Sequence, residues 1–171
     1  MGGISMYNAR DIALYLINLD ENKNVFNLNL ATYNDRTFYE GNCRLNKMLQ
    51  MALNIYYAGT GKRLFKEDMY AYDNGGVVID IQENYKDLLK EKYNNSILDE
   101  HVLKILNSLY SSFGENMHIA DVIRISHQDP EWNKKSKFYE REMQKMELEN
   151  MEDWYKSKMK NLAYTIGDYN V

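Results

Sequence analysis

Apolar residues recur at helical spacing over most of the chain, and this pattern predicts a mainly helical protein. Residues 98–113 carry apolar side chains at i, i+4 and i+7, the stripe that a half-buried helix presents to a core. A second stripe covers 45–56. We expect Asn42 to cap that helix at its start, and Gly59 and Gly61 to end it.

Three further segments favour helix. Residues 6–19 are apolar around most of their circumference, which predicts a central helix buried on several sides. Residues 119–123 indicate a shorter helix. From 132 to about 164 there is no Gly or Pro and charges of both signs are mixed, with Glu152 and Lys156 at a supporting i, i+4 spacing. The pattern predicts a long C-terminal helix.

The remaining patterned segments favour short strands. Residues 22–41 are rich in Asn and alternate apolar with polar side chains, which indicates a small hairpin or an ordered insertion. Residues 69–72 predict a short strand, and 74–76 predict a tight turn after it. Residues 77–81 fit strand or helix, so we expect a change of state near Gln82. The predicted fold class is mainly α: a single compact helical domain with a small β-hairpin and a long C-terminal helix.

Composition narrows the class of protein. A chain of 171 residues, 44% hydrophobic and 27% charged, is typical of one water-soluble domain, and we assign it to 1–171. Its net charge of −4 disfavours a nucleic-acid partner. The single cysteine, Cys43, excludes an internal disulfide and a thiolate zinc cluster. No basic, apolar leader opens the chain, so we expect a cytoplasmic protein with no membrane partner.

Candidate chemistry is sparse. Residues 59–63 resemble the end of a phosphate-binding loop, but the first glycine of that motif would fall at Tyr56, and Arg63 replaces the magnesium-binding Ser or Thr. The glycines are better explained as a helix end. The three histidines, at 101, 118 and 127, are too far apart for one local ligand motif. We therefore predict no catalytic residues, no metal and no cofactor, and no enzymatic activity.

The predicted C-terminal helix carries more apolar residues than a single core-facing stripe requires. Its large apolar side chains include Met143, Met146, Met151, Trp154 and Tyr155. Such a stripe is commonly core. Methionine, tryptophan and tyrosine also provide adaptable contact area at interfaces, so the second interpretation is a partner-binding face.

A set of short motifs resembles a known family. In chain order they comprise Leu45, Lys47, Met48 and Leu49, then Leu64 and Phe65, then Ala71 and Tyr72 leading to Gly75, Gly76 and Val77, and finally Ser126, His127, Pro130 and Trp132. This ordered set resembles the Panacea domain, also called the SocA-like antitoxin domain or phage-associated GepA-like domain. The resemblance covers about 6–132, the domain core, and leaves about 132–165 as a C-terminal helical extension.

The resemblance implies a function and roles for these residues. It implies a bacterial or prophage-encoded antitoxin of a toxin-antitoxin system, which neutralises a cognate toxin by direct binding or by delivering it to a AAA+ protease. The motif residues would be chiefly architectural: Leu45, Met48 and Leu49 would fill the core, Gly75 and Gly76 would permit a turn close to the helices, and His127 with Trp132 would hold the last loop. Lys47 and Tyr72 could instead contact the partner.

Two other classes stay open as alternatives. The first is a prophage-encoded DNA-binding regulator, which the net charge disfavours. The second is a small enzyme in which His127 acts as a base with Asp129 or Glu131. The fifteen tyrosines are also compatible with a homo-oligomer.

Overall fold

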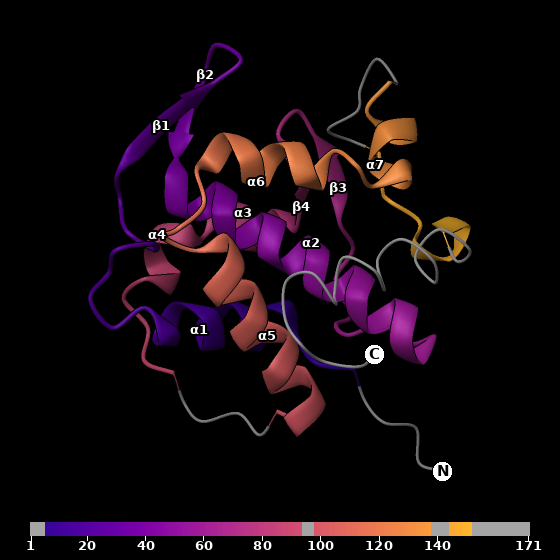
Figure 1. The fold of residues 1–171 in the computed structure, drawn as a ribbon, viewed down its shortest axis with the longest axis horizontal. Coiled ribbons are helices and arrows are strands. Elements are labelled where there is room, and N and C mark those ends of the chain that lie inside the picture. The colour runs from indigo at the N-terminus through magenta and orange to yellow at the C-terminus, as the bar shows by residue number, and fades with distance from the viewer. Residues whose placement is uncertain (1–5, 94–97, 138–143, 152–171) are drawn as a thin grey trace.

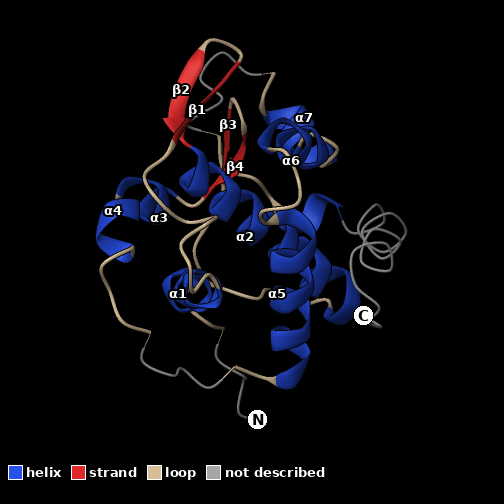
Figure 2. Ribbon diagram, turned by 60° about the vertical axis from the view of Figure 1, so that its left-hand side comes forward, coloured by secondary structure: helices blue, strands red, loops and turns tan. Residues whose placement is uncertain are grey.

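The computed structural model describes residues 6–93, 98–137 and 144–151, and these form a mainly α fold, as predicted (Figures 1 and 2). None of the described helices has both the length and the apolarity needed to cross a membrane. The helices are α1 (Ala9–Leu19), α2 (Glu40–Thr60), α3 (Ile79–Glu83), α4 (Tyr85–Leu88), α5 (Glu100–Phe113), α6 (Ile119–Ser126), α7 (Pro130–Lys135) and the 3-10 helix η2 (Leu148–Met151). The strands are β1 (Leu30–Tyr33), β2 (Arg36–Tyr39), β3 (Tyr70–Tyr72) and β4 (Gly75–Val77).

Helix α2 runs through the middle of the molecule and organises the core (Figure 1). It packs against α1, α5 and α6, and also against α3, β2 and β4. Because neighbours surround it, nearly every residue from Gly41 to Ala58 is buried. Helix α1 is buried on most sides, as the sequence predicts.

Strands β1 and β2 form the hairpin that the 22–41 pattern suggested. They pair antiparallel, with Leu30 opposite Tyr39 and Tyr33 opposite Arg36. The two turn residues, Asn34 and Asp35, have φ of 49° and 63°. Positive φ at both positions is the geometry of the tight hairpin turns that suit the twist of paired strands, and Asn and Asp tolerate it best after glycine.

Strands β3 and β4 form a second hairpin whose turn is shifted from the predicted one. Tyr72 pairs with Gly75, so the turn residues are Asp73 and Asn74 rather than 74–76. Gly75 and Gly76 belong to β4 and are buried beneath α2 side chains. The change from strand to helix comes at Ile79, before the predicted position near residue 82.

The predicted cap at Asn42 is wrong. Helix α2 begins at Glu40, directly after β2, and Tyr39 is its N-cap residue. Asn42 lies within the helix, where its Nδ2 donates to the carbonyl of Gln82 at 3.0 Å. The other end follows the prediction for Gly61, which ends α2 with a left-handed φ of 72°.

One continuous helix from residue 132 is also wrong. Helix α7 ends at Lys135, and residues 144–147 run antiparallel to β3, with Met146 N donating to Met69 O at 2.8 Å. Ala71 N donates to Gln144 O at 3.0 Å. Backbone groups of residues 144–147 therefore bind the edge of β3 opposite β4 instead of forming hydrogen bonds within a helix. Residues 138–143 and 152–171 lie outside the described residues.

Candidate functional site

Helix α2 carries a row of polar side chains through the core. Asn42, Asn46, Gln50 and Asn54 follow one another at intervals of four, and we call them the polar row. Residues four apart lie on one face of a helix, so the row forms a single stripe. All four are buried, between 0% and 7% exposed. Buried amides require hydrogen-bond partners, and the partners of this row come from distant parts of the chain.

The polar row binds the backbone of β4 and the residue after it. Gln50 Oε1 accepts from Gly76 N at 2.8 Å, and Asn46 Oδ1 accepts from Val78 N at 2.9 Å. These amides face α2 because β4 pairs only with β3 among the described strands. The side chains of α2 thus satisfy backbone groups that a third strand would otherwise bind.

Lys47 lies beside this row and completes the attachment. Its side chain is 1% exposed, and its Nζ donates to Gly76 O at 2.6 Å. Burial lowers the pKa of Lys47 to about 8, against a smaller opposing effect of Cys43. The hairpin approaches closely because it lacks side chains there: a Cβ on Gly75 would lie 2.5 Å from Ser126 Oγ and 2.7 Å from Lys47 Cδ.

The loop between α6 and α7 covers the other side of the hairpin. The rings of His127 and Trp132 stack with centroids 3.8 Å apart and planes 4° from parallel. Trp132 Nε1 donates to Tyr72 O at 2.7 Å. Burial, and then the nearby charge of Lys47, lower the pKa of His127 to about 4, while a backbone hydrogen bond with Asp73 opposes them. At neutral pH the imidazole is therefore uncharged.

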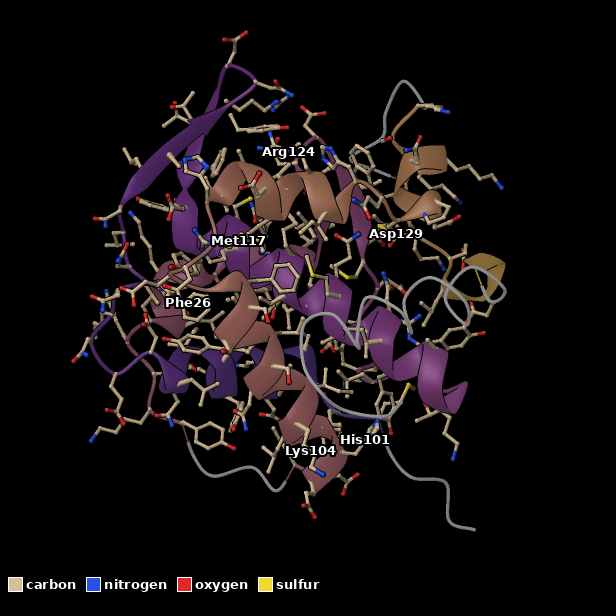
Figure 3. All side chains as sticks on the ribbon, viewed as in Figure 1. Phe26, His101, Lys104, Met117, Arg124 and Asp129 are labelled. Atoms are coloured by element: carbon tan, nitrogen blue, oxygen red, sulfur yellow. The ribbon has the colours of Figure 1, made fainter. Side chains whose placement is uncertain are left out.

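The two carboxylates that follow His127 are engaged in the fold. Asp129, beside the start of α7 in Figure 3, caps that helix by accepting from Glu131 N at 3.0 Å through Oδ1. Its Oδ2 accepts from Gln50 Nε2 at 3.1 Å and Asn54 Nδ2 at 2.9 Å. Glu131, 1% exposed, accepts from Glu147 N at 2.6 Å. These bonds join α2, α7 and the 144–147 segment.

A cavity of about 280 Å³ opens between the two hairpins and α2. Cys43 and Lys47 line it, and an ion pair between Arg36 and Asp73 joins the hairpins at its edge. Burial raises the pKa of the Cys43 thiol, and the charges of Lys47 and Arg44 lower it less. The thiol is thus protonated at neutral pH, which makes it a poor nucleophile.

The predicted partner-binding residues do not form one described surface. Met146 is 8% exposed and lies against β3, so the interpretation as core applies to it. Lys47, also a predicted partner contact, is buried, and its ammonium is bonded to Gly76 O. Tyr72 is half-buried. Met143, Trp154, Tyr155 and the side chain of Met151 lie outside the described residues.

The residues that carry the family resemblance occupy structural positions. Pro130 opens α7 in its first turn, where its missing N–H costs nothing. The apolar ones are at most 3% exposed: Leu45, Met48, Leu49, Leu64, Phe65, Ala71 and Val77. Sequence reasoning missed the polar row, although its spacing of four was a visible signal in a helix that also carries an apolar stripe.

Comparisons with protein-family models, with curated proteins and with solved structures found no match to this chain. No group of three or more His, Cys, Asp or Glu side chains suited to a metal occurs among residues 6–93, 98–137 and 144–151.

Proposed function

We propose that the protein is an antitoxin-like, protein-binding module that neutralises a cognate toxin in the bacterial cytoplasm. Neutralisation would occur by direct binding or by delivery of the toxin to a AAA+ protease. The supporting observation is that three of the four segments with the Panacea-like motifs, although far apart in the chain, bind one another around Lys47, while Leu64 and Phe65 pair with Tyr7. Lys47 and Gly76 are 29 positions apart and share a hydrogen bond, and Tyr72 and Trp132 share another across 60.

This convergence supports the resemblance for a physical reason. A chance series of short motifs would be scattered over the fold, whereas motifs that describe one domain should contain the residues that hold its parts together. Here Gln50, directly after the first motif, binds both Gly76 N and Ser126 O, so its side chain links two further motif segments to α2. A net charge of −4 favours a protein partner over nucleic acid.

Growth of a bacterial host tests the proposal. The gene adjacent to that of this protein is expressed with and without the full chain, and the tagged chain is then purified. We expect toxicity that the chain suppresses. Co-purification of the neighbour's product would support direct binding, and its protease-dependent loss would support delivery. A harmless neighbour, or toxicity that the chain leaves unchanged, would reject the proposed function.

The C-terminal interface is tested in the same assay. A variant with Met151→Lys and Trp154→Glu should lose neutralisation if these side chains contact the toxin, because a charge at an apolar contact is costly to desolvate. Thermal unfolding of the variant checks that the domain still folds. Full neutralisation by a folded variant would remove these two residues from the interface.

A further inference from the structure

A larger cavity, of about 590 Å³, lies on a different part of the surface. On one side of the cavity is α4, and on the other are the end of α1 and the segment that follows α1. This segment and α4 lie on the same side of the molecule in Figure 1, and Figure 3 labels Phe26 there. Its apolar lining consists of Ile17, Phe26, Leu28 and Leu89. Its charged lining consists of Lys23, Lys86, Lys90 and Asp20.

The carboxylate of Asp20 is occupied by groups of the fold. Its Oδ2 accepts from Val25 N at 2.9 Å and Phe26 N at 2.7 Å, and its Oδ1 accepts from Tyr110 OH at 2.8 Å. These bonds hold the segment after α1 against α5 and bury Phe26, which is 1% exposed. The one acid that lines the cavity is therefore already used to shape its wall.

The three lysines present cationic groups to an incoming anion. Lys23, Lys86 and Lys90 are all exposed, and none forms an ion pair with another described residue. The ammonium of Lys86 lies 5.4 Å from the centre of the Tyr39 ring. An apolar wall with three cationic groups around it complements a ligand that is apolar in part and acidic at its edge.

Exposed leucines extend the apolar surface beyond this cavity. Leu28 is 51% exposed and Leu30 is 65% exposed, whereas large apolar side chains in the described residues are otherwise mostly covered. Leu28 also lines the cavity, and Leu30, two positions further on, is the first residue of β1. A small molecule inside the cavity would leave Leu30 uncovered, but a protein segment lying along this face would cover it.

We propose that Lys23, Lys86, Lys90, Leu28 and Leu30, with the cavity that the lysines surround, form the docking surface for an acidic, apolar segment of the toxin. We call it the docking surface. An apolar side chain of the toxin enters the cavity, and neighbouring carboxylates pair with the lysines. This assignment rests on the proposed function and adds the chemistry of the segment that the toxin must present.

Charge reversal tests the electrostatic part. Lys86→Glu with Lys90→Glu in the full chain should raise the Kd for the purified toxin at least about tenfold, because attraction becomes repulsion. The effect should shrink at high salt, since exposed charges are screened. The matched control is Lys62→Glu with Lys66→Glu, two exposed lysines outside the cavity, for which we expect less than about a twofold change.

Leu28→Asn with Leu30→Asn tests the apolar part. Both side chains are exposed, so the substitutions should leave folding intact. We expect weaker toxin binding with its salt dependence retained, because the lysines are unchanged. Met6→Asn, at another exposed apolar residue, is the control and should bind like the wild type.

The outcomes separate this inference from the proposed function. If the wild type neutralises the toxin and all four surface substitutions leave Kd unchanged, the docking surface is wrong and the proposed function stands. If the wild type does not bind the toxin, both fail. Dodecanoate, an anionic amphiphile, probes a small-ligand site: loss of dodecanoate binding in the variants with unchanged toxin affinity would also overturn the docking surface.

Discussion

Lys47 Nζ donates a 2.6 Å hydrogen bond to Gly76 O, and this bond joins the central helix to the β3–β4 hairpin across 29 positions of sequence. The ammonium is buried, so the fold removes a cation from bulk water and offers one backbone carbonyl in return. Burial of a charge with few partners costs free energy. That cost makes the attachment of the hairpin sensitive to pH and to small changes of packing.

The stability of the protein should depend on Lys47 above neutral pH. The pKa of about 8 in the folded state lies below the ordinary 10.5, so between these values the unfolded chain binds more protons. The free energy of unfolding should therefore rise with pH in this window, by up to about 1.4 kcal/mol per pH unit. Urea unfolding of the wild type and of Lys47→Met at pH 7 to 10 measures this. We expect the free energy of unfolding of the wild type to rise relative to that of the variant as the pH increases.

The control for this experiment is Lys62→Met, at an exposed position. The difference in free energy of unfolding between this variant and the wild type should stay constant over the same pH range. A flat difference for Lys47→Met as well would contradict a buried, charged Lys47.

His127 should give a dependence of the same sign, in which stability rises with pH, but at acidic pH. Its pKa of about 4 lies below the ordinary 6.5, so the stability that it contributes is complete above pH 6.5 and is lost as the pH falls towards 4. His127→Phe keeps a flat ring for Trp132 to stack on and removes the titration. We expect the wild type to lose more stability than this variant between pH 6.5 and 4, measured by urea unfolding. Equal losses would show that the imidazole titrates normally.

Removal of the Lys47 charge should raise the pKa of His127. The positive charge of Lys47 is the second cause of the lowered value, after burial, so Lys47→Met should reverse part of the shift and leave the rest. Titration of the imidazole by NMR in both proteins measures the change. An unchanged pKa would mean that the two groups do not interact electrostatically.

Gly75→Ala should destabilise the hairpin strongly. Gly75 has φ of 112°, which alanine rarely adopts, and the added Cβ would meet Ser126 Oγ at 2.5 Å. Strain and overpacking together should cost about 3 kcal/mol. Gly61→Ala is the matched control, since its φ is also positive, at 72°, but nothing lies within 4 Å of the added Cβ. It should cost about 1 kcal/mol. Equal losses in urea unfolding would argue against close packing at Gly75.

Arg44→Met should lower the free energy of unfolding more than a substitution at an exposed arginine. Arg44 is 3% exposed, and its Nη1 donates to the carbonyls of Phe113, Gly114 and Met117, at the end of α5 and in the loop after it. Methionine leaves these acceptors unsatisfied, at a cost of about 3 kcal/mol. Arg124→Met, which removes an exposed ion pair with Asp121, should cost less than about 0.5 kcal/mol. Similar unfolding midpoints for the two variants would contradict this role.

The local sequence pattern predicted secondary structure correctly where that structure depends on the segment's own residues. The apolar stripe of α5 identified that helix, and the alternation in 22–41 indicated a hairpin. The pattern gave a wrong prediction where contacts with a neighbouring element determine the secondary structure. Asn42 has the chemistry of a helix cap, but β2 runs straight into α2 and leaves it inside the helix. Residues 144–147 have helical composition, but the open edge of β3 offers backbone hydrogen bonds that hold them extended.

The sequence by itself determined the helical class, the main core residues and the motifs that resemble an antitoxin domain, because these depend on spacing along one element. Only the tertiary structure showed that three of the four motif segments meet around Lys47, that the polar row of α2 binds backbone amides which a further strand would otherwise bind, and that three lysines surround an apolar cavity. Those relationships join residues far apart in the chain, and their hydrogen bonds, burial and charges exist only once packing has brought the elements together.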